Sequence, residues 1–261
     1  RGIYHSIENM AQVSKFGWGI WVYLWNIRSK WATIRWRKWM SWGVNPWVKV
    51  INDTAIAVNQ LGARAWAISV TLDVFHKDIY DFLDLQTETW DIRRKAFDIF
   101  PCVSFPDLFM ERLKNGLPWT IFDPKEVFDV TGEKLQDKYG DEFEQFYHAL
   151  EMDDRIKQKE VVNIRDLFKA YLKCTVETGM PYAFFRDTVN KGNPNKHAGM
   201  VYNTNLCTEI CQNISAPEFE WEELEDGTVS LKYKTWDAVT CNLASINVAK
   251  VYTQEKIDEV I

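Results

Sequence analysis

Alternation between strand-like and helix-like segments is the feature that most restricts how this chain can fold. Short apolar runs at 67–72, 99–105 and 182–186 are separated by longer segments with the spacing or end signals of helices. In the segment 163–178, Asn163 can cap the first turn and Gly179 can end the helix. Further strands are expected at 19–24, 203–210, 229–234 and 237–243, and further helices at 3–16, 45–60, 77–85, 106–115, 254–260 and within the acidic segment 123–160. This order favours a mostly parallel sheet or barrel in one α/β domain.

Length and composition are those of a globular protein. The chain has 261 residues, of which 46% are hydrophobic and 26% charged, so it can bury a large core. It has no run of about 18 apolar residues and no signal-like start, so we expect neither a membrane span nor secretion. Its five cysteines are spread out without a zinc-binding set, which favours a reducing, cytoplasmic compartment. Because it starts at Arg1, inside a helical pattern, the chain looks like an internal part of a longer protein.

A basic segment near the N-terminus contrasts with the rest of the chain. Residues 1–50 hold eight Lys or Arg against one Glu, although the net charge of the whole chain is −6. Between 28 and 38 there are five basic residues and no acid: Arg28, Lys30, Arg35, Arg37 and Lys38. Such a local reversal of charge indicates an anion site, and a merely solvated loop is the alternative.

The stretch from Asn205 to Glu209 carries the most chemistry. If it is a strand, Asn205, Cys207 and Glu209 share one face, about 7 Å apart in steps of two residues. An amide, a thiol and a carboxylate in a row can hold a substrate hydroxyl, carry covalent or radical chemistry and accept a proton. The alternative is a half-exposed strand with a structural cysteine in the core.

Several other sequence blocks accompany this stretch along the chain. The full set is NDTAIAV at 52–58, HKDI at 76–79, RRKAFD at 93–98, PDLFMER at 106–112, NPNKH at 193–197, NLCTEI at 205–210 and CNLASIN at 241–247. In their order and spacing these blocks resemble the large, catalytic subunit of class I ribonucleotide reductase, over essentially the whole chain. The resemblance implies a single partial domain over 1–261, roughly the first half of a ten-stranded α/β barrel. The N-terminal activity module and the later barrel strands would lie outside the chain.

The resemblance implies a role for each residue of the stretch. Cys207 would be the radical cysteine that takes the 3′ hydrogen of a ribonucleotide, and Glu209 would accept the proton of the 3′-hydroxyl. Asn205 would hydrogen-bond the substrate hydroxyls, and Cys241 would be one of two reducing cysteines. Because radical transfer needs a water-free pocket, these groups are expected to be buried. With the second reducing cysteine upstream of Arg1, the chain is not expected to turn over alone.

The resemblance also implies regulation and partners. Arg28 and Arg35 would hold the triphosphate of an ATP or deoxynucleotide effector, and Gln60 and Arg64 would relay its identity to the substrate. The implied partners are a second copy of the chain, a small subunit whose metal centre supplies the radical, and a thioredoxin- or glutaredoxin-type reductant. No cofactor would be bound by the chain itself, and neither nucleic acid nor membrane is expected as a partner.

The tryptophans depart from the family pattern. Ten of the 13 stand where that pattern has glycine: Trp18, Trp21, Trp25, Trp31, Trp36, Trp39, Trp42, Trp66, Trp90 and Trp236. Glycine serves such loops through positive φ or close backbone approach, which an indole does not suit. We therefore hypothesise that UGA codons read as glycine were rendered as Trp at these positions. The gene would then show UGA there and UGG at Trp47, Trp119 and Trp221.

Three other interpretations remain open for the function. One is a cobalamin-dependent reductase with the same barrel, and another is an inactive part that keeps only effector binding. The third concerns the first 50 residues, where basic and aromatic side chains alternate as on surfaces that bind single-stranded nucleic acid.

Overall fold

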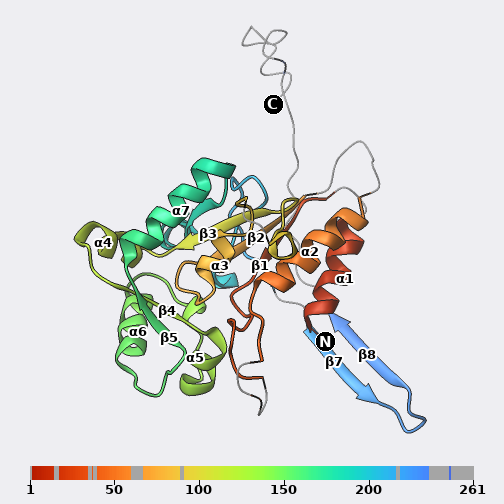
Figure 1. The fold of residues 1–261 in the computed structure, drawn as a ribbon. Helices are drawn as coiled ribbons and strands as arrows, with labels where there is room; N and C mark the ends of the chain where they lie inside the picture. The colour runs from red at the N-terminus through yellow and green to blue at the C-terminus, as the bar shows by residue number, and fades with distance from the viewer. Residues whose placement is uncertain are drawn as a thin grey trace, which may run out of the picture.

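Four parallel strands form the central sheet of the structure, a computed structural model that describes residues 2–14, 18–34, 37, 40–59, 67–88, 91–215, 218–234 and 247 (Figure 1). They are β1 (Ile20–Tyr23), β2 (Ile68–Asp73), β3 (Phe100–Phe105) and β6 (Tyr182–Phe185), in the spatial order β1-β2-β3-β6. Ile20 pairs with Ile68, Ser69 with Phe100, and Cys102 with Tyr182. The parallel sheet with its connecting helices confirms the predicted α/β class.

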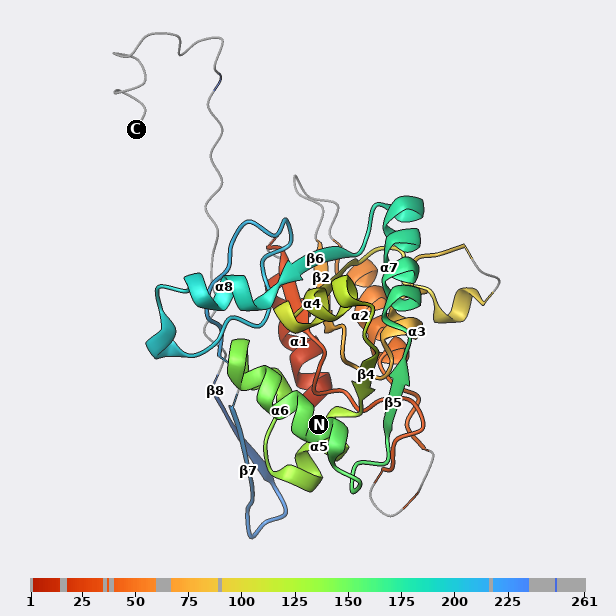
Figure 2. The ribbon, with the colours of Figure 1, turned by 90° about the vertical axis from the view of Figure 1, so that its left-hand side faces the viewer.

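Helices flank the sheet and lie on the long connections that parallel strands require. Along the chain they are α1 (Gly2–Ser14), α2 (Asn45–Ala57), α3 (Ile79–Leu83), α4 (Asp107–Asn115), α7 (Ile164–Thr178) and α8 (Arg186–Gly192). The predicted signals act as expected in α7, where the Asn163 side chain accepts a hydrogen bond from the Arg165 amide at 2.9 Å. Gly179 then ends this helix with φ 78°, and Gly116 ends α4 with φ 67°. Figure 2 shows α1 and α2, and α3 and α7, as neighbouring pairs.

A smaller unit interrupts the alternation between β3 and β6. It contains β4 (Trp119–Phe122), α5 (Pro124–Thr131), α6 (Gly140–Met152) and β5 (Lys159–Val162), and β4 and β5 pair antiparallel. The helical prediction for 123–160 is right for α5 and α6 and wrong at β5, while β4 was not expected. A parallel bridge between His76 and Phe122 links this unit to the end of β2. Short 3-10 turns lie at Ile92–Arg94 (η1), Leu135–Asp137 (η2) and Lys196–Ala198 (η3).

An antiparallel hairpin of β7 (Glu218–Glu223) and β8 (Val229–Lys234) extends from the body beside the start of α1 (Figure 1). The strand predicted at 229–234 is confirmed, whereas β7 was not expected. The strand predicted at 237–243 and the helix predicted at 254–260 lie outside the described residues.

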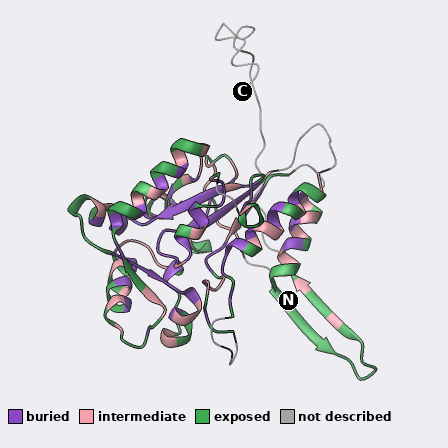
Figure 3. Cartoon of the chain, in the orientation of Figure 1, coloured by how far each residue is buried: buried purple, intermediate pink, exposed green. Residues whose placement is uncertain are grey.

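The core lies between the sheet and its helices, where Figure 3 shows continuous burial. All six residues of β2 are buried, as the two-sided covering of a parallel strand requires. Aromatic rings fill the junction with the smaller unit, with Trp119 stacked on Tyr147 at 4.5 Å between ring centroids. Among the described residues, no helix is long and apolar enough to cross a membrane.

The tryptophans at family glycine positions occupy different environments. Among those described, only Trp31 has the left-handed backbone that favours glycine, with φ 66°, and its side chain is 47% exposed. Trp25 instead is 1% exposed and packs on Phe75 with ring centroids 4.5 Å apart. The backbone argument for glycine therefore applies at Trp31, and the codon hypothesis as a whole stays a prediction.

Two substitutions test this difference. Trp31→Gly should raise the free energy of unfolding by about 1 kcal/mol, because a left-handed residue with a side chain costs roughly 1–2 kcal/mol. Trp25→Gly should lower it by about 3–5 kcal/mol, the usual effect of deleting a buried aromatic side chain. Urea unfolding measures both. A destabilised Trp31→Gly variant would show that no backbone strain is relieved there.

Candidate functional site

The stretch Asn205–Ile210 is a hydrogen-bonded turn in the structure, so the strand predicted over 203–210 is wrong. The Asn205 amide donates to the Ile210 carbonyl at 3.1 Å, and the Asn205 side-chain oxygen accepts from the Ile210 amide at 2.9 Å. The Thr208 amide donates to the Asn205 carbonyl, and Thr208 itself has φ 70°. A left-handed residue ends the strand-like alternation of side chains, so Asn205, Cys207 and Glu209 do not line one strand face.

The turn presents its three candidate groups differently. Asn205 is buried and serves as the bracket of the turn, whereas Cys207 and Glu209 are exposed. The expectation of burial is therefore right for Asn205 and wrong for the other two residues. Cys207 and Glu209 are exposed because the hydrogen bonds between Asn205 and Ile210 close the base of the turn and leave its tip in solvent.

This turn lies against the amino ends of both edge strands of the sheet. A Cβ placed on Gly19, just before β1, would lie 3.9 Å from the Cβ of Leu206. At β6, burial and then the nearby Cys207 raise the pKa of Tyr182. Burial and the Glu209 carboxylate likewise raise the pKa of the Cys211 thiol. The thiol and carboxylate thus stand at one end of the parallel sheet.

The remaining cysteines divide into buried and undescribed ones. Cys102 and Cys174 are 2% and 3% exposed, and the Cys174 thiol donates to the Leu83 carbonyl at 3.1 Å. Burial raises the pKa of Cys102 to about 12. Both thiols are therefore packed into the core. Cys241, predicted as a reducing cysteine, lies outside the described residues.

The basic loop lies at the opposite, carboxyl end of β1. Arg28 is partly exposed, and its guanidinium donates to the Thr33 carbonyl at 3.0 Å, which orients it within the loop. The backbone of Ser29, Lys30 and Val44 is bound by the buried carboxylates of Asp78 and Asp123, which the sequence did not single out. Arg35, Gln60 and Arg64 lie outside the described residues.

Sequence reasoning also missed a row of hydrogen-bonded, buried polar side chains, Arg186, Asp73 and Tyr23, which lies beside a cavity of about 500 Å³. Arg186 pairs with Asp73 at 3.0 Å, and the Tyr23 hydroxyl donates to the same carboxylate. Burial raises the pKa of Asp73 and, together with the Asp73 charge, that of Tyr23. Tyr23 and Tyr202 line the cavity with ring centroids 5.4 Å apart. Charged residues at the ends of apolar strands were the available signal, because Asp73 ends β2 and Arg186 follows β6. Within the described residues, no cluster of His, Cys, Asp and Glu is arranged to hold a metal ion.

Thiol exposure leads to a direct chemical prediction. Iodoacetamide at mildly alkaline pH should alkylate Cys207 first, because its thiol is exposed, while Cys102 stays unmodified as a buried thiol of raised pKa. Mass spectrometry of peptides over time measures the order, and urea-unfolded protein, in which both thiols should react, is the control. Equal labelling of Cys102 and Cys207 in the folded protein would contradict the described burial.

Comparison with known proteins places the chain in a family. The family model described as "Ribonucleotide reductase, barrel domain" matches residues 1–261. The ribonucleoside-diphosphate reductase subunit alpha of Treponema pallidum is 43% identical over 256 residues, which cover 96% of this chain and 30% of that protein. The same subunit of Synechocystis is 42% identical over 255 residues, covering 97% of this chain and 31% of that protein.

A plant relative extends the similarity beyond bacteria. The ribonucleoside-diphosphate reductase large subunit of Arabidopsis thaliana is 35% identical over 256 residues, covering 98% of this chain and 28% of that protein. The chain thus spans about a third of the length of these relatives. The match over all 261 residues and the parallel α/β sheet agree, and the chain belongs to the ribonucleotide reductase family as part of its barrel domain.

Proposed function

We propose that this chain is the part of a ribonucleoside-diphosphate reductase large subunit that carries the radical cysteine and the effector loop. The observation that carries the proposal is the Asn205–Ile210 turn, which exposes a thiol and a carboxylate two residues apart at the amino end of a parallel sheet. The relatives whose sequences match this chain are named as ribonucleoside-diphosphate reductases. A thiol beside a carboxylate is the pair that hydrogen abstraction with proton removal requires.

In the proposed reaction, a thiyl radical on Cys207 takes the hydrogen atom from C3′ of the ribose, and Glu209 takes the proton of the 3′-hydroxyl. The 2′-hydroxyl leaves as water. Of Cys241 and a second thiol, one gives the proton that this hydroxyl needs to leave as water, and the other gives a hydrogen atom to C2′. The two sulfurs become a disulfide by passing one further electron to the sugar. Glu209 then returns its proton to the 3′-oxygen, and Cys207 returns its hydrogen atom to C3′. Asn205 brackets the turn through its backbone and its side-chain oxygen, and the NH₂ group of the same side chain would donate to a substrate hydroxyl.

Exposure of Cys207 bears on how this reaction proceeds. A thiyl radical and an activated ribose both need protection from water. Since the tip of the turn is open among the described residues, we propose that the bound ribonucleotide and other parts of the whole protein cover it. The radical would come from a metal-containing small subunit, and a thioredoxin- or glutaredoxin-type protein would reduce the disulfide.

The second part of the proposal is control by ATP or a deoxynucleoside triphosphate at the basic loop. Arg28 and Arg35 would bind the phosphates, with Gln60 and Arg64 between effector and substrate. The separation of charge supports this, because a basic segment stands in a chain of net charge −6. A homodimer in the cytoplasm completes the proposed assembly.

Cysteine variants of the whole protein, assayed with its small subunit, test the reaction. Cys207→Ser should abolish deoxyribonucleotide formation, because a serine hydroxyl does not form the hydrogen-abstracting radical, while substrate binding is retained. Cys211→Ser is the matched control, four residues away and partly buried, and should keep the rate within a few-fold. Turnover by Cys207→Ser at the control rate would rule out the proposed radical role.

Glu209→Gln addresses the proton acceptor separately. Loss of a general base typically lowers the rate by roughly a hundredfold or more, so kcat should fall by that factor while the KM for ribonucleotide changes little. Steady-state kinetics of product formation measure the two constants. If only KM rises, Glu209 binds substrate without taking the proton.

A further inference from the structure

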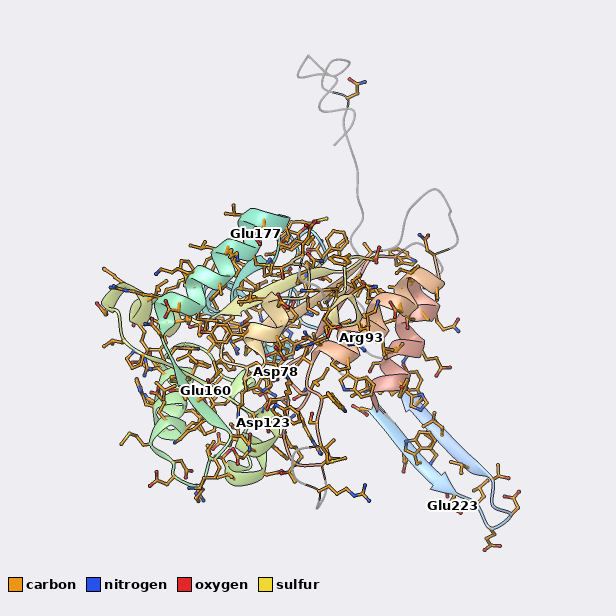
Figure 4. All side chains as sticks on the ribbon, viewed as in Figure 1. Asp78, Arg93, Asp123, Glu160, Glu177 and Glu223 are labelled. Atoms are coloured by element: carbon orange, nitrogen blue, oxygen red, sulfur yellow. The ribbon has the colours of Figure 1, made fainter. Side chains whose placement is uncertain are left out.

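Two buried carboxylates fasten the base of the basic loop, whose ends are Ile27 and Val44. We propose that Asp78 and Asp123 are positioning residues that hold this loop in the shape that binds a triphosphate. The inference rests on the proposed effector site and adds the residues on which that site depends. In Figure 4 both carboxylates lie in the interior of the molecule, between the sheet and the smaller unit.

Asp78 closes the loop by binding Lys30 near its start and Val44 at its end. Its Oδ1 accepts a hydrogen bond from the Lys30 amide at 2.9 Å, and its Oδ2 accepts one from the Val44 amide at 3.0 Å. Gly43 lets the backbone approach this closely, because a Cβ there would lie 2.9 Å from the Lys30 nitrogen and 3.1 Å from the Asp78 Cγ. One side chain therefore joins two positions fourteen residues apart.

Asp123 makes the second attachment from the smaller unit. Its Oδ2 accepts hydrogen bonds from both the amide and the hydroxyl of Ser29, each at 2.7 Å. Its Oδ1 caps α5 by accepting from the Glu126 amide at 2.8 Å. The loop is thus attached to a helix start that lies 94 residues further along the chain.

His76 fixes Asp78 relative to the end of β2. Its Nδ1 accepts from the Asp78 amide at 3.0 Å, so its Nε2 carries the proton that is donated to the Ile27 carbonyl at 2.9 Å. The imidazole is fully buried. His76 therefore holds both Ile27, the first residue of the loop, and Asp78 in place relative to the end of β2.

The absence of a cationic partner separates these carboxylates from ordinary structural ion pairs. Asp78 is 6% exposed and Asp123 1% exposed, and no described Lys or Arg pairs with either of them. The Lys30 ammonium instead lies 3.5 Å from Asp81. Burial raises the pKa of Asp78, which shows the penalty of keeping this charge away from water. Both carboxylates bind backbone amides of the loop, so the two charges stabilise its backbone conformation.

Among the described residues, this attachment uses backbone amides and the Ser29 hydroxyl rather than basic side chains. Both clamped ends lie outside the segment 33–40, which contains Arg35, Arg37 and Lys38. Arg28 lies between Ile27 and Ser29, which His76 and Asp123 bind, and its guanidinium donates to the Thr33 carbonyl. A preorganised loop binds a polyanion more tightly because less conformational freedom is lost on binding. Releasing the clamp should therefore weaken triphosphate binding while leaving the Cys207 turn, at the other end of the sheet, unchanged.

Asp78→Asn in the whole protein tests the proposal, with dTTP as the probe. The carboxamide introduced at position 78 can accept a hydrogen bond from one of the two backbone N–H groups, but it places its own NH₂ group against the other one. Loss of a hydrogen bond to a charged group weakens an interaction by about tenfold or more, so the Kd for dTTP should rise by about that factor. Without effector, kcat and the KM for ribonucleotide should match the wild type. Asp81→Asn, which removes only a partly exposed ion-pair partner of Lys30 and Arg94, is the matched control and should bind dTTP normally.

Gly43→Ala reaches the same clamp by a different route, because its methyl group would displace the Asp78 carboxylate. A raised Kd for dTTP in both variants, with unchanged effector-free kinetics, is the expected result. Normal dTTP binding in both variants would overturn the clamp and leave the effector assignment standing. If the wild-type protein shows no saturable dTTP binding, the effector assignment and the role of the clamp both fail.

Discussion

The buried ion pair between Arg186 and Asp73 is the contact on which the arrangement of the strand ends depends. The two side chains are 1% and 0% exposed and lie 3.0 Å apart. Arg186 also donates to the carbonyls of Gln136 and Lys138, at 2.6 and 2.7 Å, and thereby attaches the smaller unit to the sheet. Removing one partner of such a pair leaves a buried charge alone and typically costs about 3–5 kcal/mol. The pair thus ties β2, β6 and the segment that follows α5 into one rigid carboxyl end.

Because the carboxyl end of the sheet is rigid, the basic loop there and the Cys207 turn at the opposite end can each be held in shape by separate contacts. The basic loop follows β1 and is fastened by Asp78 and Asp123, while the Cys207 turn lies at the amino ends of β1 and β6. Helix α2 starts directly after the clamped loop and leads the chain back towards the amino end of β2. The segment 60–66, with the proposed specificity residues Gln60 and Arg64, follows this helix in the chain.

Local rules predicted those parts of the fold that local interactions decide. The cap at Asn163 and the stop at Gly179 are contacts within a few residues, so the sequence shows where α7 begins and ends. The error at 203–210 has the opposite origin. Alternating polar and apolar residues do not reveal that the Asn205 side chain binds the Ile210 amide or that Thr208 turns left-handed. The hydrogen bonds of Asp123 to Ser29, 94 residues apart, likewise depend on the complete fold. Candidate site residues could therefore be chosen from the sequence, but the contacts that support them could not.

Backbone strain provides a last pointer that is independent of any family resemblance. Among the described residues, only Trp31 and Thr208 adopt positive φ without being glycine. Such conformations cost free energy and persist where surrounding contacts enforce them, which occurs preferentially at functional sites. Trp31 lies inside the loop clamped by Asp78, and Thr208 directly follows Cys207 in the turn bracketed by Asn205. The strain at Thr208 thus lies in the turn for which hydrogen abstraction is proposed, whereas the same backbone conformation at position 31 would carry no strain with the glycine hypothesised there. At Thr208 the β-branched side chain makes this conformation especially unfavourable, and the hydrogen bonds of Asn205 with Ile210 and Thr208 close the turn that enforces it.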